Sequence, residues 1–96
     1  MAIEREILAK RDEILRLASQ HGATRVRVFG SVARGDSGPD SDLDLLVDTR
    51  PQTSAWFPAS LILDLEDLLG RKVDVVTERA LHRLLREQIL AEAVPL

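Results

Sequence analysis

Two aspartates stand two positions apart in the stretch "DLDLLV", residues 42–47. Alternation of polar and apolar residues is typical of a strand with one buried face, so Asp42 and Asp44 are predicted to point to the same side, with Cα atoms roughly 6.6 Å apart. Two neighbouring carboxylates repel each other, and a raised pKa or a bound cation relieves that repulsion. Either outcome would make this face of the strand chemically unusual.

A third carboxylate follows in a second alternating stretch, "KVDVV", residues 72–76, where Asp74 lies between two valines. If the two strands are neighbours, Asp42, Asp44 and Asp74 form a cluster of oxygen ligands that suits one or two Mg²⁺ ions. Two such ions can clamp the attacking and leaving oxygens in phosphoryl transfer. An Asp-x-Asp pair alone is more often two solvated acids on a strand edge, so the interpretation depends on what precedes it.

A candidate phosphate site precedes the aspartates. The alternating stretch "TRVRVF" ends in Gly30 and Ser31, where glycine lets a ligand approach the backbone and the hydroxyl and amides at a helix start suit phosphate. Arg34 lies one helical turn later and can help to hold a triphosphate. The sequence lacks both a P-loop and the spaced glycines of a dinucleotide fold. A phosphate site beside an acid cluster therefore predicts a nucleotide site of another kind.

The elements that would position these residues follow from hydrophobic periodicity. We expect an amphipathic helix over residues 3–18, a strand ending at 29, a short helix at 32–34, a strand at 42–47, a helix from Pro58 to Gly70, a strand at 72–76 and a last helix at 79–93. In that last helix, Leu81, Leu84, Leu85 and Ile89 are expected to face inward. This order indicates an α/β or α+β fold with a small sheet.

Composition limits the class of protein. The chain has 96 residues, a net charge of −3 and no cysteine, so we expect one domain over residues 1–96 without disulfides, thiolate catalysis or Cys-bound zinc. The acidic balance argues against duplex DNA as a partner. No signal peptide and no apolar run long enough to span a membrane is present, so a cytoplasmic location is expected.

The motifs together resemble a known family. Gly30-Ser31, ten further residues, and Asp42-Leu43-Asp44 resemble the signature of the DNA polymerase β-like nucleotidyltransferase superfamily, and "GSVARGDSGPDSDLDLLV" is similar to its minimal nucleotidyltransferase (MNT) branch. The resemblance extends through "RKVDVVT" to the closing "REQILAEAVPL". It implies the polymerase β-like fold, a small mixed sheet flanked by helices.

The resemblance also implies roles for individual residues. Asp42 and Asp44 would bind Mg²⁺, two ions in all, and Asp74 would help to bind one of them near the acceptor hydroxyl. The implied nucleotide-binding residues are Gly30, Ser31, Arg34 and Ser41. The implied reaction transfers AMP from ATP to an acceptor hydroxyl, and pyrophosphate leaves.

Larger members of the superfamily carry another domain that binds the acceptor, and this chain shows none, so a partner protein is expected. The resemblance implies a small helical HEPN toxin, which the MNT protein would adenylylate as its antitoxin within a hetero-oligomer. Two alternatives remain: an antitoxin of the same fold that acts by occlusion alone, and a structural protein. An intact set of three repelling acids argues against both.

Overall fold

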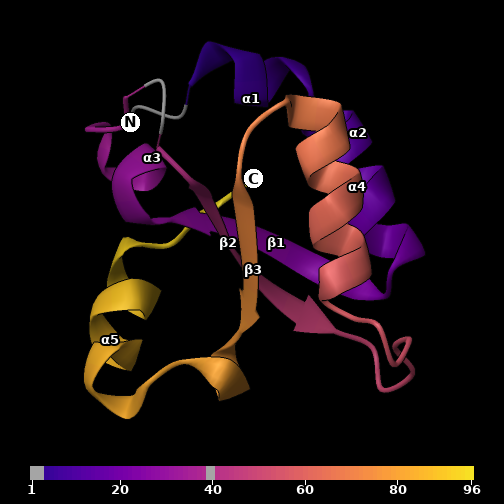
Figure 1. Ribbon diagram of the computed structural model, residues 1–96. Helices are drawn as coiled ribbons and strands as arrows, with labels where there is room; N and C mark the ends of the chain where they lie inside the picture. The colour runs from indigo at the N-terminus through magenta and orange to yellow at the C-terminus, as the bar shows by residue number, and fades with distance from the viewer. Residues whose placement is uncertain (1–3, 39–40) are drawn as a thin grey trace.

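The computed structural model describes residues 4–38 and 41–96 and contains helices on two sides of a small sheet (Figure 1). The helices are α1 (Arg5–Ala9), α2 (Arg11–Gln20), α3 (Gly30–Arg34), α4 (Ala59–Leu69) and α5 (Arg83–Glu92), with a 3₁₀ turn, η1 (Glu78–Ala80). The strands are β1 (Ala23–Phe29), β2 (Leu43–Thr49), β3 (Val73–Thr77) and β4 (Val94–Pro95). Among the described residues, no helix combines the length and apolar content needed to cross a membrane.

The four strands form one mixed sheet in the order β3-β2-β1-β4. β2 runs parallel to β3, and β1 runs antiparallel to both β2 and β4. The starts of β2 and β3 therefore lie at the same end of the sheet as the end of β1. This mixed sheet with flanking helices confirms the predicted fold class.

One face of the sheet forms the core. Val28, Leu45 and Val75 point to this face and are at most 2% exposed, because alternate residues of a strand share a side. The helices α2 and α4 pack together over it and contribute their apolar stripes, among them Ile14 and Leu65. The helices α3 and α5 lie on the other side (Figure 1). The same alternation that buries the valines and leucines sends Asp42 and Asp44 away from the core.

The predicted first helix is two helices. It divides at Lys10, whose backbone leaves the helical region (φ −105°, ψ 14°) and whose ammonium donates to the Leu68 carbonyl at 3.0 Å. In Figure 1, α1 crosses the end of the sheet while α2 runs beside α4. The change of direction lets Ile7 and Ile14 both reach the core, where each is fully buried. Ile3, with which the prediction began, lies outside the described residues.

The C-terminal segment also differs from the prediction. The last helix begins at Arg83, because His82 caps it: its Nδ1 accepts the Leu84 amide at 3.1 Å. The expectation that Leu84 and Leu85 face inward is wrong, since they are 79% and 51% exposed. α5 packs against α3 and buries none of its ten residues within the described part of the chain.

A short fourth strand was not predicted. β4 pairs with β1 through two residues, and the Leu96 amide donates to the Val26 carbonyl at 3.0 Å. The Leu96 side chain is 8% exposed and belongs to the core. β4 therefore fixes the C-terminal end of α5 next to β1.

The two leucines Leu65 and Leu63 of α4 give a matched test of the core. Leu65→Ala removes a fully buried side chain and is expected to lower the free energy of unfolding by about 2 to 5 kcal/mol. Leu63→Ala changes a side chain that is 65% exposed and is expected to stay within about 0.5 kcal/mol of the unsubstituted protein. Urea unfolding measures both, and equal losses would contradict the packing described.

Candidate active site

The structure places two of the three predicted acids side by side. Asp44 and Asp74 are register partners in the parallel pair β2 and β3, so their side chains leave the same face of the sheet. Asp42 precedes β2 by one residue and shares the side of Asp44. Asp44 is partly buried, whereas Asp42 and Asp74 are exposed. The half-buried carboxylate thus lies between two solvated ones.

Gly30 brings the backbone against Asp44. Phe29, the last residue of β1, is the register partner of Asp44, and the chain turns into α3 at Gly30 with φ +75°. A Cβ at Gly30 would collide with Asp44 Oδ2 and would lie 3.3 Å from its Cγ. Both the positive φ and this contact require glycine. The turn after β1 and the acid cluster are therefore one site.

Burial, followed by the charges of Asp74 and Asp42, raises the pKa of Asp44 to about 6. The Arg34 guanidinium opposes this shift, and the Glu92 carboxylate adds to it. The cluster therefore carries more negative charge than its neighbours compensate. A divalent cation would remove that excess.

The donor set fits Mg²⁺ in chemical type, because all three groups are carboxylates. Within residues 4–38 and 41–96, however, no three acidic or histidine side chains converge closely enough to hold an ion as they stand. The register of β2 and β3 and the raised pKa of Asp44 both show that the acids are neighbours.

The predicted phosphate-binding residues lie at the start and end of α3. Gly30 and Ser31 open the helix, and Arg34 closes it. The Arg34 guanidinium is about half exposed and lies 3.4 Å from an oxygen of Asp36 and 3.4 Å from an oxygen of Glu92. These carboxylates raise the pKa of Arg34, Asp36 most strongly. Backbone amides, a hydroxyl and a guanidinium thus gather beside the acid cluster.

Ser41 stands at the other side of the cluster, in the loop before Asp42. Its hydroxyl accepts the Gly38 amide at 2.8 Å, and its carbonyl accepts from Arg71 Nη2 at 2.6 Å. Arg71 is largely buried and also pairs with Glu4 at 2.9 Å. The loop that leads into β2 is held by Arg71, while the Ser41 hydroxyl keeps its own proton free to donate.

Sequence reasoning assigned no role to Glu92, the last residue of α5. The Gly30 amide donates to Glu92 Oε1 at 2.9 Å, and the Glu92 side chain is 20% exposed. Sixty-two positions separate the two residues. Only the position of α5 relative to α3 brings them together, and no local pattern in the sequence encodes that position.

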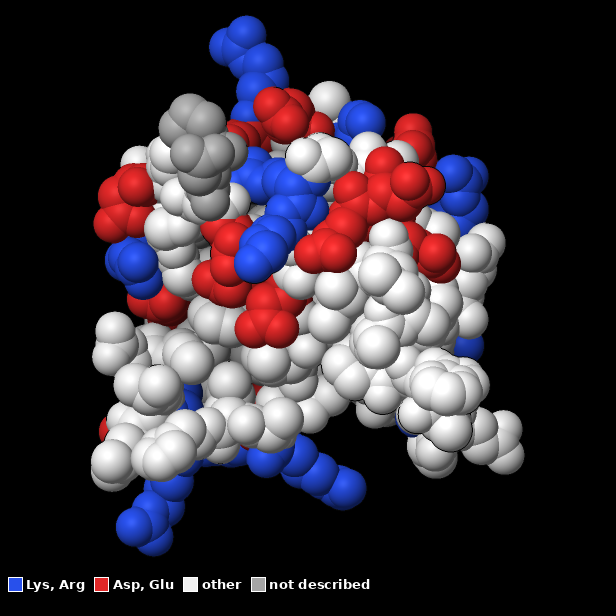
Figure 2. Space-filling model, in the orientation of Figure 1, with Lys and Arg blue, Asp and Glu red and all other residues white. Residues whose placement is uncertain are grey.

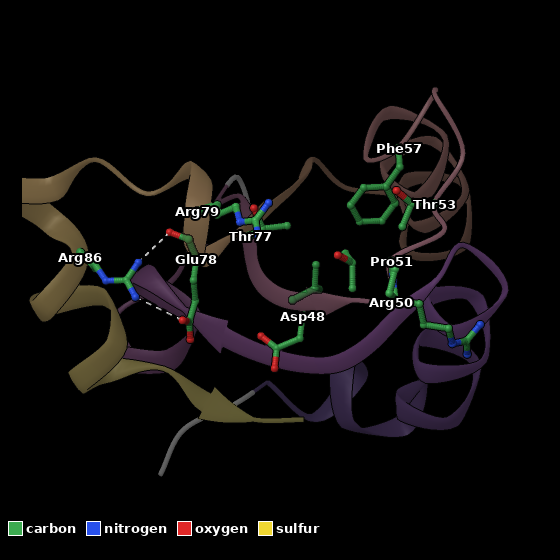
Figure 3. A pocket seen from close by; sticks show the side chains of 11 residues that line it. Asp48, Arg50, Pro51, Thr53, Phe57, Thr77, Glu78, Arg79 and Arg86 are labelled. Carbon is green, nitrogen blue, oxygen red and sulfur yellow. Dashed lines mark hydrogen bonds and ion pairs between the residues drawn. The ribbon is translucent and has the colours of Figure 1, made fainter.

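A hollow lies at the opposite end of the sheet from the acid cluster, where β2 and β3 end (Figure 3). It has a volume of about 810 Å³, and Thr77, Phe57 and Arg79 are among its lining residues. It lacks uncompensated acids. Its two carboxylates, Asp48 and Glu78, are paired with arginines.

Those ion pairs distinguish the two ends of the sheet. Arg27 is 6% exposed and donates to Asp48 at 3.3 Å and to Glu78 at 3.0 Å. Arg86 also reaches Glu78, at 3.4 Å. The hydrogen bond from Arg27 and the neighbouring arginines lower the pKa of Glu78, the reverse of the shift at Asp44.

The surface charge follows the same division. Figure 2 shows acidic side chains gathered toward the upper part of the visible face, where α3 and the starts of β2 and β3 lie in Figure 1. Long basic side chains project at the bottom of the view, and other basic side chains lie among the acids at the top. Of the two ends, the acidic one carries the Gly-Ser turn, the crowded carboxylates and a nearby guanidinium.

The profile of the family described as "Nucleotidyltransferase domain" matches residues 10–96. The chain belongs to this nucleotidyltransferase family. A candidate protein adenylyltransferase of Methanocaldococcus jannaschii is 39% identical over 82 residues, which are 85% of this chain and 88% of that protein. The protein adenylyltransferase MntA of Thermococcus cleftensis is 37% identical over 78 residues, 81% of this chain and 79% of that protein. These relatives confirm the predicted minimal nucleotidyltransferase resemblance and the enzyme class.

Solved structures agree with this membership. The structure of a candidate minimal nucleotidyltransferase is 52% identical, has a TM-score of 0.85 and covers 100% of this chain and 97% of its own. A complex of a tri-AMPylated HEPN toxin from Shewanella oneidensis with an MNT antitoxin has a TM-score of 0.69 at 19% identity, covering 92% of this chain and 69% of that one. At that identity the second likeness concerns the nucleotidyltransferase fold alone.

The raised pKa of Asp44 predicts how stability depends on pH in metal-free buffer. The folded pKa, about 6, lies above the unfolded value of about 4, so folding takes up a proton between them. The stabilisation is complete below pH of about 4 and is lost as the pH rises through about 6. Asp44→Asn is therefore expected to raise the melting temperature at pH 8 and to flatten this dependence.

Thermal melts from pH 4 to 8 with EDTA measure the effect. Asp67→Asn, an exposed acid on α4, serves as the matched control and is expected to follow the unsubstituted protein. If the melting temperatures of Asp44→Asn and the unsubstituted protein changed with pH in parallel, the pKa of Asp44 would not be raised in the folded protein.

Proposed function

We propose that this nucleotidyltransferase transfers AMP from ATP to a hydroxyl of a partner protein, with Mg²⁺ as its cofactor. The observation that carries the proposal is the half-buried Asp44, which lies against the Gly30 backbone and between two further acids. An uncompensated acid cluster beside a phosphate-sized set of donors suits a metal-bound triphosphate.

Each residue has a part in the proposed reaction. Gly30, Ser31 and Arg34 bind the phosphates and orient the triphosphate, since amide, hydroxyl and guanidinium are all donors. Asp42, Asp44 and Asp74 would hold Mg²⁺, which would supply positive charge against the charge that develops on the phosphate oxygens. The Ser41 hydroxyl donates to the nucleotide from the other side of the cluster.

The arrangement explains how catalysis can proceed without a covalent intermediate. The acceptor hydroxyl gives its proton to solvent or a neighbouring carboxylate as its oxygen bonds to the α-phosphorus, the bond from the α-phosphorus to the bridging oxygen breaks, and pyrophosphate leaves. Positioning supplies much of the rate, because the reactants are held in line. Asp74, the exposed acid on β3, borders the solvent side from which an acceptor hydroxyl would approach.

The named relatives support a protein acceptor of the HEPN type. The relatives at 39% and 37% identity are named as protein adenylyltransferases. A structure of the same fold contains an AMPylated HEPN toxin with its MNT antitoxin, and another contains AMP-PNP. By this reasoning the chain would act as an antitoxin in a hetero-oligomer, by modification rather than by occlusion.

Co-expression with a HEPN-type partner protein tests the proposal. After incubation with ATP and Mg²⁺, intact mass spectrometry is expected to show one or more AMP additions on the partner. Asp44→Asn should abolish the additions and leave the complex intact, because the substitution removes a metal ligand and preserves the size of the side chain. Asp67→Asn is expected to retain full transfer.

A stable complex in which the unsubstituted protein never changes the partner's mass would contradict the proposal. If that complex still neutralises the toxin, occlusion would be the function.

A further inference from the structure

Glu92 already contacts two of the three residues assigned to the phosphates, Gly30 and Arg34. Its Oε1 accepts the Gly30 amide at 2.9 Å, and its two oxygens lie 3.4 and 3.5 Å from Arg34 Nη1. A carboxylate and a terminal phosphate are both anionic groups that only accept hydrogen bonds from such donors. Glu92 therefore presents to Gly30 and Arg34 the same kind of contact that a nucleotide would.

The two contacts exclude each other. The Gly30 amide has one proton, and it donates that proton in full strength to one acceptor at a time. A triphosphate at this amide would also bring several negative charges next to the Glu92 carboxylate, at a distance where like charges repel strongly. Nucleotide binding at Gly30 therefore requires the Glu92 side chain to leave.

The position of Glu92 is not explained by the acid cluster. Its negative charge contributes to the crowding around Asp44, so it does not stabilise those acids. What it gains is the amide of Gly30 and the guanidinium of Arg34, two donors that would otherwise face solvent or a ligand. Its favourable contacts are thus the two that a nucleotide would take over.

We propose that Glu92 is an intramolecular competitor of the nucleotide: it holds Gly30 and Arg34 in the free protein and releases them when a triphosphate binds. This inference rests on the proposed function, because it takes Gly30 and Arg34 as phosphate ligands. Glu92 is the last residue of α5, and α5 has no buried residue among those described. Nucleotide binding is therefore coupled to the C-terminal end of α5.

A different role for Glu92 predicts the opposite result. If its carboxylate only held the Gly30 turn in shape for the nucleotide, removing it would weaken nucleotide binding. If it competes, removing it strengthens binding. The sign of the change in Kd thus separates a competitor from a positioning residue.

Calorimetric titration with AMP-PNP and Mg²⁺ measures that sign. Glu92→Ala removes the hydrogen bonds that compete with the phosphates for Gly30 and Arg34. Because hydrogen bonds to charged groups are among the stronger ones, the Kd is expected to fall roughly tenfold to a hundredfold. Glu92→Gln keeps the size and one acceptor oxygen but loses the charge, and a smaller decrease is expected. Glu87→Ala changes an exposed acid of the same helix and is expected to leave the Kd unchanged.

An independent readout uses no nucleotide. In amide NMR spectra of the free protein, Glu92→Ala is expected to shift the Gly30 amide signal and to speed its hydrogen exchange, whereas Glu87→Ala should change neither. An unchanged Gly30 signal would overturn the inference. If Glu92→Ala fails to fold, Glu92→Gln decides, and a Kd equal to or higher than that of the unsubstituted protein overturns it.

Ser31→Ala separates the two proposals. Loss of its phosphate contact is expected to raise the Kd roughly tenfold to a hundredfold, the reverse of Glu92→Ala. If Ser31→Ala weakens binding and neither Glu92 variant strengthens it, only the competition is wrong. If the unsubstituted protein binds no AMP-PNP at millimolar concentration, the proposed function fails, and the competition fails with it.

Discussion

The contact between Asp44 and the backbone of Gly30 is the constraint around which the acidic end of the molecule is arranged. The antiparallel register of β1 and β2 places the end of one strand opposite Asp44, and the parallel register of β2 and β3 places Asp74 beside it. Only a glycine with positive φ allows the chain to turn into α3 at that point. The phosphate donors of α3 and the carboxylates of the sheet are consequently within reach of one ligand.

Acidic side chains have opposite electrostatic environments at the two ends of the sheet. At the far end, Arg25 and Arg27 pair with Asp48, and Arg27 and Arg86 pair with Glu78, so both carboxylates have cationic partners. At the near end, Asp44 has acids for neighbours and a raised pKa, and Arg34 shares its charge with Asp36 and Glu92. The near end retains an electrostatic cost that a cation can remove, which is a property expected of a metal and nucleotide site and not of a structural ion pair.

Local patterns were sufficient to predict the face from which the acids project, because period and spacing decide the face on which a strand residue lies. They predicted that Asp44 and Asp74 would leave the sheet on the side opposite the core, and the register confirms it. They failed where distant segments decide. Leu84 and Leu85 follow a helical period but find no surface to pack on in the described chain, and Glu92 reaches Gly30 only through tertiary contacts. The Mg²⁺, ATP and partner assignments remain predictions.

The most direct test is a crystal structure with Mn²⁺ in place of Mg²⁺ and AMP-PNP in place of ATP, in which anomalous scattering locates the metal. The account predicts an anomalous peak bound by Asp42 and Asp44, phosphate oxygens on the Gly30 amide, and a Glu92 carboxylate that has left that amide. A metal and triphosphate bound elsewhere, for example in the hollow beside Thr77 and Arg79, would contradict it.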